Sequence, residues 1–450
     1  MSSVILRRHL VPLGLLALYL SAVPASASAT AVEAEAELPT VLTLDEAVGL
    51  LRERGIDILV AESAVASAEG DLRIAGAIPN PGLAGSIGKS YQLGGGGGVQ
   101  PYGPPAFSVF LSDNNALAEL ITGKRGLRQD VARAALAASR GARKDVERTL
   151  VYQLRQQFLL ALQAQRLLLV NRENQQGATQ FLDLTDRRYR LGAISEADVA
   201  RVRTAKLESD QAVDTAAQAL LQAKAAVGFY LGQRGALPQF ELKEGDYGHY
   251  ALPSGLPDTS IETLLRRGFQ NRPDLKAARA QLASVEAALT LARRQRVPDV
   301  GLTLGYSVQG FSSTAVQVTP PTFSLGLSTT VPVFYFAQGE VQKAAAAVNT
   351  QRLLTRKAEA QVTADVVSAY AGFSGSSQLV QRMETGGLLD SAKRARDLVL
   401  IQYQKGAASL LDFLTAQQTF NATRIEYQQD LTGYWNAVFQ LEQAMALEIP

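Results

Sequence analysis

Cysteine is absent from this chain of 450 residues, and histidine occurs only twice. Without cysteine there is no disulfide framework, no thiolate metal ligand and no lipid-bearing cysteine at a processed amino terminus. His9 lies in a leader segment and His249 stands alone, so one chain cannot build a histidine-based catalytic triad or zinc motif. The sequence therefore predicts no catalytic residue, no metal site and no cofactor.

The chain also has little net charge of either sign. Its 44 basic and 42 acidic residues give a formal charge of +2, and Arg7 and Arg8 of the leader account for this excess. A protein that binds nucleic acid is expected to be visibly basic. We therefore expect no nucleic-acid partner.

A secretory signal peptide is predicted over residues 1–29. Arg7 and Arg8 precede an apolar run from Leu10 to Ala22, and small residues follow as far as Ala29. The run is shorter than the roughly 20 residues that a membrane-spanning helix requires, which argues against the alternative of a membrane anchor. Cleavage is expected after Ala27 or Ala29.

The rest of the chain contains two copies of one long unit. Residues 43–83 match residues 260–300, with each residue 217 positions from its counterpart. A second match, with an offset of 214, aligns Tyr189, Gly192, Ala193, Ser195 and Asp198 with Tyr403, Gly406, Ala407, Ser409 and Asp412. We predict repeat 1 at 30–231, a connector at 232–259 and repeat 2 at 260–450. Each repeat is expected to contain, in order, one helix, two strands, a long helix and a return helix.

Each repeat is predicted to contain two strands, at about 81–92 and 106–112 in the first and about 298–309 and 322–333 in the second. Apolar residues alternate with small or polar ones, most clearly from Val300 to Val308. Long connections rich in glycine, proline or polar residues separate the strands of each pair. Aromatic residues gather near the strand ends: Tyr91, Tyr102, Phe311, Phe334, Tyr335 and Phe336.

Alternation alone would also fit half-buried strands of a soluble sheet. Strands of about ten residues with aromatic residues at their ends instead match the strands of an outer-membrane barrel. Four strands cannot close a barrel, because the smallest ones have eight, and an open edge in lipid is not tolerated. Several copies of the chain are therefore expected to share one barrel.

Very long helices are predicted from Gly126 to about Tyr189 and from Gly339 to about Tyr403, because neither stretch contains proline. About 65 residues give a rod on the order of 95 Å long. Gly192 and Gly406 are typical helix-ending glycines, and Ser195 and Ser409 then start return helices. A periplasmic coiled-coil protein would explain the rods but not the strands, and a self-contained porin would need more strands and no rods.

This pattern resembles the outer membrane factor family of the TolC type. The two repeats, the Asn80-Pro81-Gly82-Leu83 entry into the first strand and the Tyr-x-x-Gly-x-x-Ser-x-x-Asp motif at both hairpin turns carry the resemblance. It implies a mixed α and β fold made mainly of long helices. Three chains would share a twelve-stranded outer-membrane β-barrel, continued by an α-helical barrel in the periplasm.

The resemblance also implies a periplasmic gate at the hairpin turns, where Asp412 would form a ring of carboxylates that favours cations. A second acidic position of some relatives is Thr415 here, and a latching arginine is Ala408. Asp198, Tyr189 and Tyr403 map to the same region. The alternatives are a solvated turn carboxylate for each aspartate and interhelix packing for each tyrosine. The adaptor-docking tips correspond to Leu191, Gly192, Ala193, Lys405, Gly406 and Ala407.

The implied function is that of a passive outer-membrane channel in a tripartite efflux pump. Its partners would be two further copies of the chain, a periplasmic adaptor (a membrane fusion protein) and an inner-membrane transporter of the RND type. The chain is most similar to the CzcC-like branch, which implies export of cobalt, zinc or cadmium. The alternatives are a drug or organic-solute efflux channel and a type I protein secretion duct.

Overall fold

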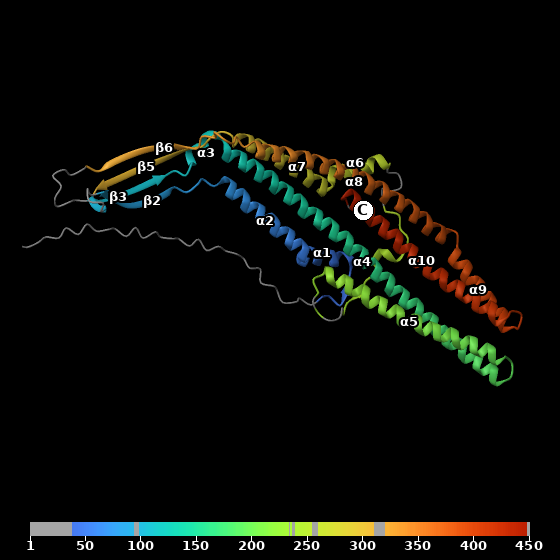
Figure 1. Cartoon of the computed structure of the whole chain (residues 1–450). Coiled ribbons are helices and arrows are strands. Elements are labelled where there is room, and N and C mark those ends of the chain that lie inside the picture. The colour runs from blue at the N-terminus through green and yellow to red at the C-terminus, as the bar shows by residue number, and fades with distance from the viewer. Residues whose placement is uncertain are drawn as a thin grey trace, which may run out of the picture. The chain divides into compact units, whose positions relative to one another are not determined.

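A computed structural model describes residues 38–93, 99–233, 235, 239–253, 260–309 and 320–447. Apart from Leu38, they belong to one unit, Pro39–Pro450 (Figure 1). The predicted signal peptide and Phe311 of the predicted aromatic girdle lie outside the described residues.

Both copies follow one order of elements: a helix pair, a strand pair, a long helical stretch and a return helix. The first contains β1 (Val41–Leu42), α1 (Leu44–Arg54), α2 (Ile56–Gly76), β2 (Gly82–Leu93), β3 (Val99–Ser112), α3 (Ala116–Thr122), α4 (Lys124–Arg190) and α5 (Glu196–Tyr230). The connector contains β4 (Glu241–Leu242) and the 3-10 helix η1 (Gly245–Gly248). The second contains α6 (Ile261–Asn271), α7 (Pro273–Arg294), β5 (Val300–Gln309), β6 (Thr322–Thr329), α8 (Gln338–Thr385), α9 (Leu388–Gln404) and α10 (Leu410–Met445).

The first helix of each copy, predicted as one, is two helices joined by a single extended residue. Arg272 has ψ 121° and precedes Pro273, which disfavours helical backbone in the residue before it. Gly55 has ψ 113°, and a Cβ atom there would lie 2.5 Å from the carbonyl oxygen of Leu51. The joint therefore depends on proline in one copy and on glycine in the other.

The long helices differ between the copies. α4 is unbroken over 67 residues, or about 100 Å at the helical rise of 1.5 Å per residue. The predicted rod from Gly339 to Tyr403 is wrong, because α8 ends at Thr385 and α9 starts at Leu388. Gly387 has φ +62°, a left-handed conformation that ends a helix and that glycine adopts without a steric cost.

The four-stranded sheet has the order β2-β3-β5-β6, and every neighbouring pair is antiparallel. Within the described residues, β2 and β6 are therefore the edges. β3 starts at Val99, seven residues before the predicted start near 106. Two of its prolines are accommodated because the β2–β3 register shifts between Gly88 and Ser90, so that Pro104 and Pro105 lie outside the regular pairing; Pro101 is paired with Tyr91 of β2.

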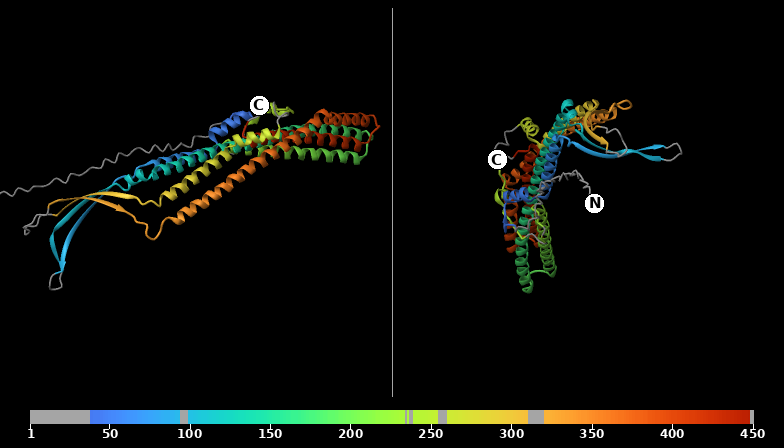
Figure 2. Two further views of the ribbon diagram at one scale, coloured as in Figure 1. Left: turned by 90° about the horizontal axis from the view of Figure 1, so that it is seen from above. Right: turned by 90° about the vertical axis from the view of Figure 1, so that its left-hand side faces the viewer.

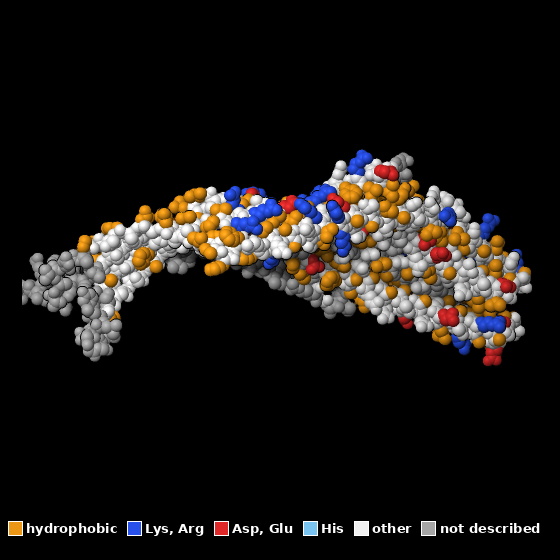
Figure 3. Space-filling view, turned by 45° about the horizontal axis from the view of Figure 1, so that its top comes forward, with side chains coloured by type: hydrophobic (Ala, Val, Ile, Leu, Met, Phe, Trp, Pro, Cys, Tyr) orange, Lys and Arg blue, Asp and Glu red, His pale blue; other side chains and the backbone are white. Residues whose placement is uncertain are grey.

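One face of this sheet is apolar and exposed. Leu83, Leu111, Leu304 and Leu325 form one row across all four strands, since directly paired residues share a face. Leu83, Leu325 and Leu327 are 69–75% exposed. On the face shown in Figure 3 the strand region displays hydrophobic and uncharged side chains, whereas charged ones begin on the helices. An exposed apolar surface of this kind marks a contact with lipid or with another protein.

The helices pack along their lengths, with α7 contacting both α4 and α8 (Figures 1 and 2). On the α4 side, a Cβ atom added to Gly141 would lie 2.9 Å from the Cβ of Ala277. On the α8 side, the Thr355 hydroxyl donates to the Ala278 carbonyl at 3.4 Å. Small residues thus allow α7 a close approach on both sides.

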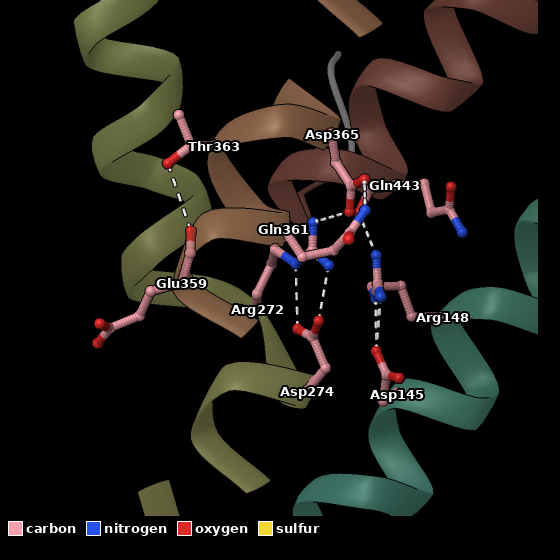
Figure 4. Close-up of polar contacts among 9 residues, drawn as sticks. All are labelled: Asp145, Arg148, Arg272, Asp274, Glu359, Gln361, Thr363, Asp365 and Gln443. Atoms are coloured by element: carbon pink, nitrogen blue, oxygen red, sulfur yellow. Dashed lines mark hydrogen bonds and ion pairs between the residues drawn. The ribbon is translucent and has the colours of Figure 1, made fainter. Parts of the chain in front are cut away.

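A buried arginine clamps α7 to α8. The Arg272 side chain is 3% exposed, and its guanidinium contacts both oxygens of Asp274 at 2.6 and 3.0 Å and Asp365 of α8 at 2.6 Å (Figure 4). Nearby on α4, Arg148 pairs with Asp145 and donates to the Gln443 carbonyl of α10. These contacts fix α7 against α8 and α4 against α10, and the parallel pair β1–β4 joins residues 200 positions apart.

Candidate functional site

The two hairpin turns have the same backbone hydrogen bonds. We name α4 with α5 hairpin 1 and α9 with α10 hairpin 2; their tips are residues 191–195 and 405–409. In tip 1, the Gly192 and Ala193 amides donate to the carbonyls of Tyr189 and Arg188 at 2.8 and 2.9 Å. In tip 2, the corresponding bonds run from Gly406 to Tyr403 and from Ala407 to Gln402. Both are Schellman motifs, which confirms the predicted helix-ending glycines.

Both glycines have left-handed backbones, with φ +70° at Gly192 and +77° at Gly406. The predicted docking residues around them lie at the surface: Leu191, Gly192, Ala193, Lys405, Gly406 and Ala407 are all exposed. Leu191 is 84% exposed.

The predicted gate aspartates take part in the amino-terminal caps of the return helices. Ser409 caps α10 with a complete capping box: its Oγ accepts from the Asp412 amide at 3.2 Å, and Asp412 Oδ2 accepts from the Ser409 amide at 2.9 Å. Ser195 caps α5 through its Oγ alone, which accepts from the Asp198 amide at 3.2 Å, and its hydroxyl donates to Asp198 Oδ2 at 2.8 Å. The serine caps are confirmed, but the aspartates' part in them was not anticipated from the sequence.

The two aspartates nevertheless differ in their surroundings. The Ser409 hydroxyl and amide both donate to Asp412 and lower its pKa, and the carboxylate is exposed. Asp198 is half-buried and lies 3.4 Å from the Arg201 guanidinium. Asp412 therefore carries an exposed negative charge, whereas a neighbouring cation partly balances that of Asp198. Thr415 lies one turn beyond Asp412 and is exposed.

The two tip tyrosines are not equivalent. Tyr403 is 8% exposed, and Tyr189 is 43% exposed. Tyr403 belongs to a buried cluster with Val202, Leu410 and Phe413. Tyr403 is thus a packing residue between helices in this chain, whereas Tyr189, at the same motif position in hairpin 1, is exposed to solvent.

Residues that sequence reasoning missed connect the hairpins to each other. Phe181 of hairpin 1 packs against Phe413 and Tyr403, with ring centroids 4.7 and 5.7 Å apart. The Arg188 guanidinium lies 5.3 Å from the Tyr403 ring centroid and donates to the Gln404 carbonyl at 3.4 Å. Because these partners are more than 200 residues apart in sequence, no local sequence pattern predicts their contact.

The two hairpins also border an open groove of about 1450 Å³, which is lined by residues of α4, α5, α9 and α10. Arg396 and Arg424 lie over the Phe420 ring, 4.6 and 5.6 Å from its centroid. Arg424 also pairs with Glu173 of α4 at 2.6 Å, which bridges α10 to hairpin 1.

Among the described residues, no group of three or more histidine, cysteine, aspartate or glutamate side chains could hold a metal ion. No described helix combines the length and apolar character needed to cross a membrane.

Comparison with known proteins adds relatives along the whole chain. CzcC of Cupriavidus metallidurans, a cobalt-zinc-cadmium resistance protein, is 24% identical, with 98% of this chain and 100% of CzcC covered. OpmQ of Pseudomonas aeruginosa, a pyoverdine export outer membrane protein, is 25% identical over 70% of this chain and 67% of OpmQ. A solved structure of CusC, described with reference to transmembrane channel formation, has a TM-score of 0.74 at 20% identity and covers 90% of this chain and 92% of that one.

A family model described as outer membrane efflux protein matches the chain twice, at residues 47–233 and 264–447. Each match contains one strand pair, one long helical stretch and one hairpin tip. The two matches cover well over half of the sequence, so this protein belongs to the outer membrane efflux protein family, whose members are passive channels of the outer membrane that extend into the periplasm and are not enzymes.

Proposed function

We propose that three copies of this chain form the outer-membrane channel of a tripartite efflux pump that exports heavy-metal cations such as cobalt, zinc or cadmium. The observation that carries the proposal is the four-stranded sheet, with an exposed apolar face and two edges that have no partner in the described chain. Such a sheet is stable in a membrane only when its edges are paired.

Copies of the chain can supply these partners to each other. All neighbouring strands are antiparallel, so β6 of one copy and β2 of the next would also run antiparallel, and the sheet closes without a break in pattern. Three copies would give twelve strands, an even number within the range of known barrels. The helices of the three copies would then continue as a duct in the periplasm.

The hairpin tips are the proposed docking surface for a periplasmic adaptor, which links the channel to an inner-membrane transporter of the RND type. Leu191 offers an exposed apolar side chain at tip 1, and Lys405 offers an exposed basic one at tip 2. Exposed backbone at Gly192 and Gly406 would allow another hairpin to approach closely.

Asp412 is the proposed selectivity residue at the gate. Three exposed carboxylates around a narrow axis would attract cations and repel anions. The pKa of Asp412 is lowered by its hydrogen bonds from Ser409, so the ring would stay charged at neutral and mildly acidic pH. Tyr403 and Phe413 would hold hairpin 2 against hairpin 1, with Asp198, Tyr189 and Thr415 around them.

The proposed assignment of the substrate is based on the similarity to CzcC, which extends over nearly the whole of both chains. The relationship to OpmQ favours a second candidate, an organic solute. Both cargoes would pass through the same duct, because selectivity of a tripartite pump resides mostly in its inner-membrane part.

Two measurements test the proposal. The protein extracted from outer membranes in mild detergent should have the mass of a trimer; a monomer released by salt alone would contradict the channel. Deletion of the gene should sensitise cells to zinc, cobalt or cadmium, and a plasmid copy should restore resistance. Unchanged metal tolerance together with lost tolerance of organic compounds would favour the second candidate.

A further inference from the structure

A cavity of about 470 Å³ lies where the strands meet the helices. Its walls come from the start of α4, the segment between α7 and β5, and the segment between β6 and α8. Its volume falls within the usual range for small-molecule sites, roughly 300–1,000 Å³. The lining residues used below are Lys124, Arg296, Asp299, Tyr335, Phe336 and Glu340.

One cation in this cavity is already neutralised within the chain. Lys124 is 6% exposed, and its ammonium donates to the Val297 carbonyl at 2.7 Å and to Asp299 at 2.8 Å. This pair of a buried ammonium and a half-buried carboxylate fixes the start of α4 against the start of β5. Lys124 and Asp299 therefore shape the wall and leave no charge for a ligand.

Two opposite charges in the same cavity remain available. Arg296 is exposed and forms no ion pair or hydrogen bond with another residue that the structure describes. Glu340 is exposed and accepts one hydrogen bond, from the Tyr335 hydroxyl at 2.6 Å, which lowers the pKa of Glu340 and keeps it ionised. A ligand with both a negative and a positive group would satisfy both side chains.

The segment that follows β6 carries apolar and aromatic side chains at its surface. Tyr335 and Phe336 line the cavity and are 52% and 51% exposed. Val331, Val333 and Phe334 precede these lining residues in sequence and are 68%, 67% and 100% exposed. The segment continues from β6 of the sheet, and aromatic side chains of this kind concentrate at the boundary between lipid and water.

We propose that this cavity binds a phospholipid of the periplasmic leaflet through a phosphoethanolamine headgroup. The phosphate would contact Arg296, the ammonium would contact Glu340, and the acyl chains would lie against Phe334 and the apolar face of the sheet. Arginine suits phosphate because its planar guanidinium can donate two parallel hydrogen bonds. The proposal rests on the proposed barrel, which places this boundary at the membrane surface.

The balance of charge selects this headgroup class. A purely anionic headgroup would leave Glu340 facing a negative ligand, which is unfavourable at short range. A trimethylated ammonium would keep its charge but could donate no N–H hydrogen bond to Glu340. The cavity should therefore prefer ethanolamine over both glycerol and choline phospholipids.

The test is native mass spectrometry of the full-length protein, purified in mild detergent and titrated with each of the three phospholipids. Wild type should retain phosphatidylethanolamine in preference to the other two. Arg296→Gln should weaken its binding by at least about tenfold, the loss expected for a charge-assisted hydrogen bond. Glu340→Gln should abolish the preference for ethanolamine while some phosphate-dependent binding remains.

Arg294→Gln is the matched control, because Arg294 is also exposed and close in sequence but does not line the cavity. Equal phospholipid binding by wild type, Arg296→Gln and Arg294→Gln would overturn the proposal, and so would a cavity closed by a neighbouring copy and free of lipid. Oligomeric mass and single-channel conductance of the same samples report on the channel separately. A conducting trimer without lipid selectivity would refute only the lipid site.

Discussion

The two repeats share their helix-capping motifs but differ in how their helices are joined and packed. Both end a helix with a Schellman glycine and restart it with a serine cap. Repeat 1, however, has an unbroken α4, a glycine joint at Gly55 and an exposed Tyr189, whereas repeat 2 has a break at Gly387, an arginine clamp at Arg272 and a buried Tyr403.

This difference suggests that one repeat is more rigid than the other. α4 runs without interruption from Lys124 to tip 1 and is expected to act as a rigid strut. Hairpin 2 is separated from α8 by two residues, Gly386 and Gly387, and is held in place by side-chain contacts with hairpin 1. Motion at the tips is therefore expected mainly in hairpin 2, which also carries Asp412.

The arginine clamp should give the largest effect on stability. Arg272→Met would leave Asp274 and Asp365 without their buried partner, and breaking such a pair costs about 3 kcal/mol or more. Arg279→Met is the control on the same helix, because the Arg279–Glu359 pair is exposed and is worth at most about 1 kcal/mol. Chemical unfolding should separate the two variants, and similar midpoints would contradict the clamp.

The clamp also predicts a dependence on pH. Burial alone would raise the pKa of Asp274, but the hydrogen bonds and charge of Arg272 outweigh it and lower the pKa. A lowered pKa stabilises the fold above the unfolded value near 4, and this contribution is lost as pH falls through the folded value. Unfolding midpoints measured between pH 7 and 3 should fall less steeply for Arg272→Met than for wild type.

The buried tyrosine should give the next largest effect. Tyr403→Ala would remove a ring from the cluster between the hairpins, at a local cost of about 3 kcal/mol. Tyr189→Ala, at the same motif position in repeat 1, should cost less than about 1 kcal/mol because the ring is exposed. Hydrogen exchange of tip amides measures both, and equal protection losses would remove the distinction between the tips.

Much of this architecture follows from the sequence. The absence of proline indicated α4, Gly192 and Gly406 indicated the turns, and Ser195 and Ser409 indicated the caps. These features depend on neighbours within a few residues. The breaks at Gly55, Pro273 and Gly387 are also local, but the helix-forming residues around them obscured their signals.

The contacts that distinguish the repeats could not be read from the chain. Phe181 meets Tyr403 and Phe413, and Arg272 meets Asp365, only because the helices pack side by side. Neither pairing has a sequence spacing that local geometry would select. The matching motifs at Tyr189 and Tyr403 even suggested equivalence, whereas burial makes them different.

A smaller effect is expected from two glycines of α4. Gly141→Ala would place a Cβ atom 2.9 Å from that of Ala277 and should destabilise the protein by about 1–3 kcal/mol. Gly177→Ala lies in open space and should stabilise the same helix by about 0.5–1 kcal/mol. The opposite signs can be checked by thermal unfolding. A stabilising Gly141→Ala would mean that α7 does not approach α4 this closely.

The smallest effect on stability, and the most informative for conduction, is expected at Asp412. Asp412→Ala removes both the capping box and the charge, whereas Asp412→Gln removes the charge and keeps an acceptor for the Ser409 amide. In planar bilayers, both variants should weaken cation preference, but only Asp412→Ala should also loosen the tip and raise closed-state conductance. Asp198→Gln is the control in repeat 1 and should change ion preference less, because Arg201 already balances that carboxylate. If Asp412→Gln conducted as wild type does, Asp412 would serve only as the cap of α10, and the two tips would differ in packing but not in electrostatic function.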